Sequence, residues 1–231
     1  MPGDSSSLPE SSRPDSSSRS SPQETSIASS THNGVLLLQL TAPDNFPRLT
    51  QSALKQLRYQ FAGFSSSSGL SAAVITGTEK CFAAGAELME VSALTAVEAL
   101  RFAALGQSVM NMIENCPKPV VAAIRGYCMG GGFDLALACH SRIATPDAIF
   151  AHRGASLGII TGWGGTQRLP RILGPSGRTI ALELMTTGRT ADATEALSLR
   201  VISRIVPVDQ ILETAIEYSA KAASKSSVQR V

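Results

Sequence analysis

The chain lacks features on which several protein classes depend. Only 5% of its 231 residues are aromatic and its formal net charge is +2, so we expect neither a base-stacking surface nor a general attraction to nucleic acid or anionic membranes. No apolar run approaches the roughly 20 residues of a membrane-spanning helix. The four cysteines form no Cys-x-x-Cys pair and have no histidine at ligand spacing. These observations predict buried free thiols, no metal site and a reducing, cytoplasmic compartment.

Large apolar side chains are scarce in the N-terminal segment. Almost half of the first thirty residues are serine, and proline and charged residues are frequent among the others. Such a composition cannot bury enough surface to offset the entropy lost on ordering. We therefore predict that residues 1–32 form a disordered tail. The acidic residues Asp4, Glu10, Asp15 and Glu24 disfavour a transit peptide.

From residue 33 onward, short apolar runs alternate with longer amphipathic segments. The patterns predict strands at 34–40, 71–76, 119–126, 141–144 and 201–206. They predict helices at 50–64, 95–115, 133–139, 176–186, 192–199 and 208–223, the second opened by a capping box of Thr95 and Glu98. This alternation is typical of an α/β fold with mixed or parallel sheets. We expect a single domain with a core at 33–207 and a short C-terminal helical region at 208–231.

Two loops of small residues each follow a predicted strand. One is TEKCFAAGAEL (78–88), and the other is the triplet Gly130, Gly131 and Gly132, which opens a helix. The free N–H groups at a helix start favour negative charge, although a tight turn that needs positive φ explains the glycines equally well. Together the two loops can offer two N–H groups to one oxygen, as an oxyanion hole requires. Neither loop matches a dinucleotide or phosphate-loop pattern.

The stretch GASLG (154–158) matches the G-x-S-x-G pattern of serine hydrolases. In α/β hydrolases the catalytic histidine follows the serine, whereas His32, His140 and His152 all precede Ser156. His152 would have to act from within the same tight turn. A serine hydrolase is therefore kept only as a distant alternative.

Four ordered segments together resemble the crotonase superfamily, the enoyl-CoA hydratase/isomerase family. They are KCFAAGAEL, PKPVVAAIRGYCMGGGFDLALAC, SLGIITGWGGTQRLPRILG and TTGRTADATEALSLRVISRIVP. The resemblance covers about residues 34–215 and implies a spiral of repeated β-β-α turns. It also implies acyl-CoA thioester substrates, assembly as homotrimers or hexamers, and no cofactor, because the thioester itself is the electron sink.

The resemblance implies that two backbone N–H groups, those of Ala86 and Gly131, stabilise the enolate of the thioester. Their neighbours Ala84, Gly85, Gly130 and Gly132 are then expected to line the substrate site. Loss of one such donor typically costs about 10²–10³ in rate.

By the same resemblance, Asp134 occupies the position of the family's first catalytic glutamate. It follows Gly131 by just under one helical turn, so its carboxylate can face the same pocket. The alternative is that Asp134 only complements the positive end of the helix. Gly154 occupies the position of the second glutamate, and His152 and Arg153 are the nearest polar groups that can substitute for it.

Further departures from the family pattern concern CoA binding and the acyl pocket. TAPDNFPRL (41–49) replaces an Asn-Arg-Pro stretch that contacts CoA in the family, and the chain ends at Val231, before the family's further helices. Ile160 and Trp163 are expected to line the acyl pocket or, alternatively, to pack in the core.

The expected activity is that of an enoyl-CoA hydratase, a lyase, with Asp134 as the remaining acid/base. A double-bond isomerase or an acyl-CoA decarboxylase is the first alternative, because each needs the oxyanion hole and fewer carboxylates. A catalytically silent acyl-CoA-binding protein is the second, and the glycine at position 154 favours it.

Overall fold

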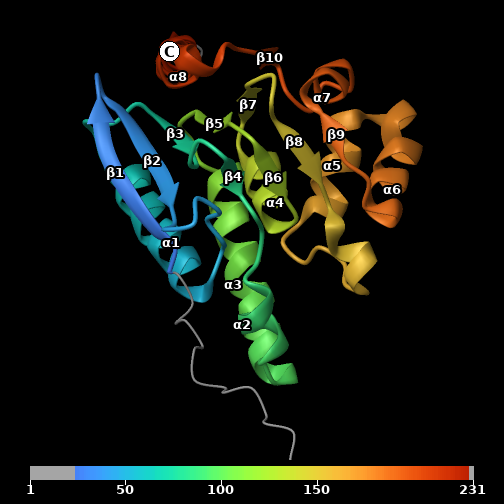
Figure 1. The fold of residues 1–231 in the computed structure, drawn as a ribbon. Coiled ribbons are helices and arrows are strands. Elements are labelled where there is room, and N and C mark those ends of the chain that lie inside the picture. Colours follow the sequence, from blue (N-terminus) through green and yellow to red (C-terminus); the bar gives the residue numbers. More distant parts are fainter. Residues whose placement is uncertain (1–23, 229–231) are drawn as a thin grey trace, which may run out of the picture.

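Two β-sheets organise residues 24–228, the part of the chain that the computed structural model describes (Figure 1). The larger sheet has the order β1-β2-β3-β5-β7-β10, formed by Ser26–His32, Val35–Thr41, Ala72–Thr76, Val120–Ile124, Ser141–Ala144 and Arg204–Ile205. The smaller sheet has the order β4-β6-β8-β9, formed by Cys81–Ala83, Tyr127–Met129, Ile149–Ala151 and Ala191–Asp192. Only the pairs β1–β2 and β8–β9 are antiparallel.

Successive strands alternate between the two sheets. β3, β5 and β7 belong to the larger sheet, and β4, β6 and β8, which follow each of them, belong to the smaller. A helix follows each pair: α2 and α3 (Leu88–Ser92 and Ala96–Glu114), α4 (Gly131–Ala138) and α5 (Gly165–Leu173). The structure therefore confirms a spiral of repeated β-β-α turns. The two loops rich in small residues lie where β4 and β6 of the same sheet end.

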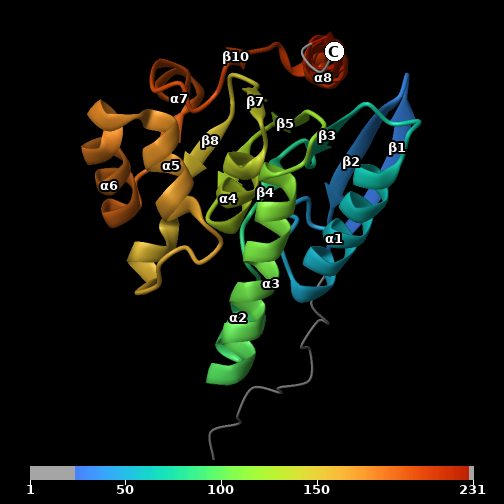
Figure 2. The same ribbon diagram turned by 180° about the vertical axis from the view of Figure 1, so that it is seen from behind.

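The larger sheet is apolar on both faces. Along β2, Leu36, Leu38 and Leu40 face one core cluster, whereas Val35 belongs to a second cluster, as expected from alternation along a strand. Helices α1 (Gln51–Ser66) and α3 pack into the first cluster and lie side by side in Figure 2. Helix α8 (Ile211–Val228) covers the second cluster. The sheet is thus buried between helical layers, as is typical of parallel sheets.

The prediction of disorder up to residue 32 is wrong for the end of that segment. Residues 26–32 form β1, which pairs along its whole length with β2, from Ser26 opposite Thr41 to His32 opposite Val35. Asn33 and Gly34 connect the strands with φ angles of 50° and 77°, the conformation of a tight hairpin turn. Backbone pairing at a sheet edge orders a polar sequence that has little apolar surface of its own. The remainder of the predicted tail, residues 1–23, lies outside the described residues.

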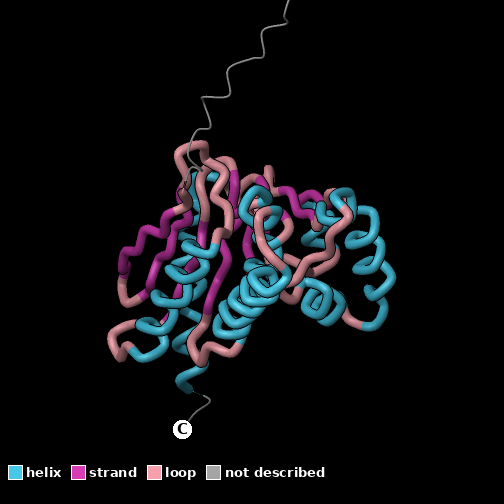
Figure 3. Tube along the Cα trace, turned by 90° about the horizontal axis from the view of Figure 1, so that it is seen from below, coloured by secondary structure: helices cyan, strands magenta, loops and turns pink. Residues whose placement is uncertain are grey.

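Most of the other predicted elements are present with shifted ends. The predicted helices correspond to α1, α3, α4, α6 (Arg178–Thr187), α7 (Ala193–Ser198) and α8. The Thr95–Glu98 capping box is confirmed by both of its hydrogen bonds. The strand predicted at 201–206 shortens to β10, and helix α5 was not predicted. Helices α5 to α7 lie at the opposite end of the molecule from β1 (Figure 1 and Figure 3).

Candidate active site

The loop after β4 and the start of α4 touch one another. Gly85 has a φ of 97°, and a β-carbon built on it would lie 3.0 Å from Met129 O and 3.2 Å from Gly131 N. Gly132 lies still closer to the end of β4, because a β-carbon there would be 2.2 Å from Ala83 O. Glycine at these positions is what allows the two loops to approach this closely.

Hydrogen bonds hold both loops in place. Ala84 N–H donates to Pro47 O over 2.8 Å, and Leu49 N–H donates to Gly85 O over 2.7 Å. On the other side, Gly130 N–H donates to Ala151 O over 2.8 Å. Gly131 is the first residue of α4, so its N–H has no carbonyl partner within the helix.

Asp134 is fully buried on the first turn of α4. Its Oδ2 accepts hydrogen bonds from the Thr161 hydroxyl and, over 3.3 Å, from Trp163 N–H. Burial penalises the charged form more than these hydrogen bonds and the nearby Arg168 favour it, which raises the pKa of Asp134 to about 6. A carboxyl group with this pKa exchanges its proton near neutral pH, as a general acid or base must.

His152 faces the same carboxylate. Its Nε2 lies 3.7 Å from Asp134 Oδ1, and its ring stacks on Phe133 with 4.9 Å between ring centroids. The side chain is only 4% exposed, and burial lowers the pKa of His152 to about 4. Asp134 Oδ1 and both His152 ring nitrogens have no hydrogen-bond partner among the described residues. The pair is therefore a buried polar site whose hydrogen-bonding capacity is not filled by the protein.

Gly165 makes room for this pair. A β-carbon at that position would lie 2.1 Å from Asp134 Oδ1 and 2.8 Å from His152 Cε1. Only glycine therefore allows the N-terminus of α5 to approach α4 this closely. Neither Gly165 nor Thr161 was among the predicted site residues. The Gly-Trp-Gly-Gly run at 162–165 was the sequence signal that could have pointed to this close approach.

The two predicted acyl-pocket residues lie in different surroundings. Trp163 is 5% exposed and packs edge-on against Phe102, with 5.3 Å between ring centroids. Its indole also lies against Gly131, whose β-carbon, if present, would be 2.3 Å from Trp163 Cζ3. Ile160 is 76% exposed, so the alternative prediction that it packs in the core is wrong.

The segment from Arg153 to Leu157 forms a 3-10 turn. Gly154 is packed tightly there, because a β-carbon would lie 2.6 Å from Ile159 O. Ser156 is exposed, and its hydroxyl donates to Arg153 O over 2.7 Å. The serine is thus engaged by its own turn and not by a histidine, which disfavours the hydrolase alternative.

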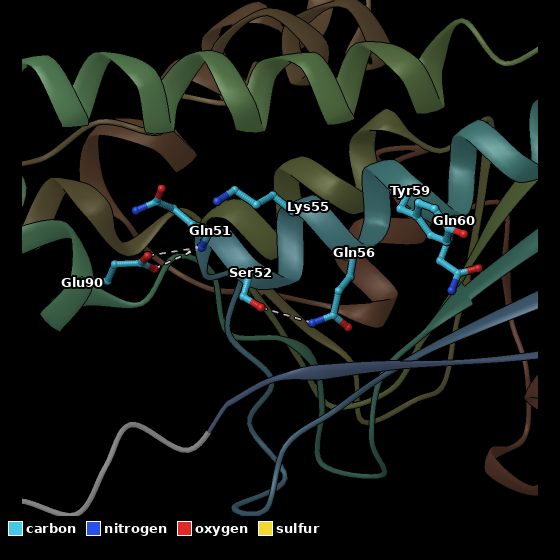
Figure 4. A pocket seen from close by; sticks show the side chains of 7 residues that line it. All are labelled: Gln51, Ser52, Lys55, Gln56, Tyr59, Gln60 and Glu90. Atoms are coloured by element: carbon cyan, nitrogen blue, oxygen red, sulfur yellow. Dashed lines mark hydrogen bonds between the residues drawn. The ribbon is translucent and has the colours of Figure 1, made fainter.

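Two pockets open on the surface of the described residues. One, of about 280 Å³, lies beside Trp163 and contains the buried Arg168, which is paired with Glu114 at 2.6 Å and donates to Trp163 O over 2.9 Å. The other, of about 630 Å³, lies along α1 (Figure 4). Its lining contains none of the predicted site residues and consists of Gln51, Ser52, Lys55, Gln56, Tyr59, Gln60 and Glu90.

Residues 24–228 contain no cluster of three or more histidine, cysteine or acidic side chains that could hold a metal ion. Nor is any helix within this range both long and apolar enough to cross a membrane.

Known proteins resemble this chain over most of its length. A family model described as enoyl-CoA hydratase/isomerase matches residues 30–230. A short-chain-enoyl-CoA hydratase of Clostridium acetobutylicum is 33% identical over 84% of this chain and 74% of its own length. A crotonyl-CoA hydratase of Syntrophomonas wolfei is 34% identical over 83% and 73%. The crystal structure of an enoyl-CoA hydratase from Bacillus anthracis has a TM-score of 0.80 and 34% identity, and the match covers 87% of this chain and 77% of that one.

Proposed function

The chain belongs to the enoyl-CoA hydratase/isomerase family, and from that membership we propose that it binds acyl-CoA thioesters and acts as an enoyl-CoA hydratase. The observation that carries the proposal is the approach of the Gly85 loop to Gly131 at the start of the helix that bears Asp134. Two loop ends meet there, and the same helix carries a carboxyl group with a raised pKa three residues after Gly131.

The N–H groups of Ala86 and Gly131 are the proposed oxyanion donors. In this mechanism both donate to the thioester carbonyl oxygen, which becomes an enolate oxygen in the transition state. Fixed donors stabilise that charge without reorganising, because the hydrogen bonds of Ala84 and Gly130 already hold the two loops.

Asp134 is the proposed acid/base. As its carboxylate, it takes a proton from water, whose oxygen bonds to the β-carbon of the enoyl group. The proton is then delivered to the α-carbon, which gives a 3-hydroxyacyl thioester. Because position 154 is glycine, the Asp134 carboxyl group performs both proton transfers. His152 is its neighbour, with Nε2 at 3.7 Å from Asp134 Oδ1. Asp134 is buried beneath the Thr161 hydroxyl and the Trp163 N–H, so the Thr161 side chain must be displaced when substrate and water enter.

Purified protein mixed with crotonyl-CoA tests the proposal. We expect the conjugated enoyl absorbance to disappear and mass spectrometry to show a product heavier by one water. Asp134→Asn should slow the reaction by about 10²–10⁴, because it removes a general acid/base. Ala86→Pro removes one oxyanion N–H and should cost about 10²–10³.

Other products would identify the alternatives. A shifted double bond would indicate an isomerase, release of CO₂ from a carboxylated acyl-CoA would indicate a decarboxylase, and tight binding without turnover would indicate a silent acyl-CoA-binding protein. Any of these results without hydration would overturn the hydratase proposal. Assembly as homotrimers or hexamers and a cytoplasmic location stay predictions.

A further inference from the structure

The indole of Trp163 lies directly beside the proposed oxyanion donor. We infer that Trp163 determines which acyl groups the site accepts and restricts it to short ones. This inference rests on the proposed function, because it takes Gly131 N–H as one of the donors to the thioester carbonyl.

The indole fills the space between α3 and the start of α4. A β-carbon at Gly131 would lie 2.3 Å from Trp163 Cζ3, and one at Gly106 would lie 2.2 Å from Trp163 Nε1. The six-membered ring therefore covers the first residue of α4, and the pyrrole edge reaches α3. An acyl chain attached to a thioester at Gly131 would have to share this space with the ring.

The backbone of Trp163 is anchored on both sides. Its N–H donates to Asp134 Oδ2 over 3.3 Å, and its carbonyl accepts from Arg168 Nη1 over 2.9 Å. Arg168 is itself 5% exposed and paired with Glu114. The backbone that carries the indole is therefore fixed, which keeps the ring beside Gly131.

The flanking glycines leave the indole as the only bulky group in this part of the loop. Gly162, Gly164 and Gly165 surround it in the sequence, and Gly164 has a φ of 107°. Truncation of Trp163 should therefore open the space next to Gly131, with Phe102 as the neighbouring ring. A pocket discriminates by roughly 10–200-fold for each methylene that it accepts or excludes.

Binding of two saturated thioesters, butyryl-CoA and decanoyl-CoA, tests the inference by calorimetry. Neither ligand carries the double bond that hydration needs, so the measurement is independent of turnover. We expect wild type to bind butyryl-CoA more tightly than decanoyl-CoA. The ratio should shift by about tenfold or more toward decanoyl-CoA in Trp163→Ala. Trp163→Phe should give an intermediate ratio, and Tyr59→Ala, at an exposed position on α1, should keep the wild-type ratio.

Tryptophan fluorescence gives a second readout, because Trp163 is the chain's only tryptophan. Butyryl-CoA should change the emission of wild type, because its acyl group would contact the buried indole. An unchanged ratio in a Trp163→Ala protein with native circular dichroism would overturn the inference, and Trp163→Leu replaces that variant if alanine prevents folding. A shifted ratio of butyryl-CoA to decanoyl-CoA affinity without hydration of crotonyl-CoA would support the inference. It would reject only the proposed hydratase activity. If neither wild type nor any variant binds either thioester, both the inference and the proposed function are rejected.

Discussion

At the scale of single residues, folding shifts the pKa values of Asp134 and His152 in opposite directions. The pKa of Asp134 rises from 3.8 to about 6, so between these values the folded state binds more protons than the unfolded state. Its contribution to the unfolding free energy therefore decreases as pH rises through this window. The pKa of His152 falls from 6.5 to about 4, so its contribution increases as pH rises over nearly the same window. The two effects oppose each other in the wild-type protein.

Asp134→Asn should separate the two effects, because it removes the contribution of Asp134 to the pH dependence of the unfolding free energy. The amide keeps an acceptor for the Thr161 hydroxyl and Trp163 N–H but does not titrate. We expect the unfolding free energy of the variant, relative to wild type, to increase between about pH 4 and pH 6 by a few kcal/mol, on the order of 3. Urea denaturation at a series of pH values measures it. A difference that stays constant with pH would show that Asp134 is not shifted by burial.

The sequence indicated where the candidate residues lie along the chain, but not which of them contact one another. Asp134 and Gly131 were placed by the resemblance and by helical spacing, and both lie on the first turn of α4. The contact between Asp134 and His152 depends on the proximity of α4 and the end of β8, which no local spacing encodes. Likewise, the packing of Trp163 on Gly131 depends on how the loop before α5 folds back, and composition gives no information about that.

At the scale of elements, α5 begins where it meets the Asp134–His152 pair. Gly165→Ala improves helix propensity but places a β-carbon 2.1 Å from Asp134 Oδ1, so we expect a net destabilisation of about 1–3 kcal/mol. Gly162→Ala is the matched control, because nothing lies within 4 Å of the β-carbon that it adds. Thermal unfolding of both variants measures the difference. Equal melting temperatures would show that α5 can shift away from α4 at no cost.

The missed elements share a physical cause, which is weak local signal. β4, β6 and β8 have only three residues each, too few to display a period, and they are ordered by pairing with one another. Helix α5 contains Pro170 and begins with Gly165, both unfavourable to a helix prediction. β1 is rich in serine, and the Asn33-Gly34 pair was the one hairpin signal in that region. Long periodic segments such as α1 and α3 were predicted correctly.

At the scale of the whole molecule, the interleaving of two sheets places the two candidate-site loops on one of them. These loops lie at the ends of β4 and β6 in the smaller sheet, whereas the larger sheet is buried between helices on its two faces. Alternating periodicity predicted an α/β fold and the family resemblance implied repeated β-β-α turns, but neither assigned successive strands to different sheets. Strand order depends on contacts between distant segments, and a single sequence does not display them.

Helix α8 completes this architecture by covering the outer face of the larger sheet. Ala215 is fully buried there, in the cluster that contains Val74 and Val121, whereas Leu212 on the same helix is 36% exposed. Ala215→Glu leaves helix propensity almost unchanged and buries a charge with no partner in that cluster, so we expect a loss of about 3–5 kcal/mol in unfolding free energy. Leu212→Glu adds the same charge at an exposed position and should cost far less. If urea denaturation gives equal losses for the two variants, α8 does not pack on the sheet in solution, and its contribution to the fold would have to be rejected.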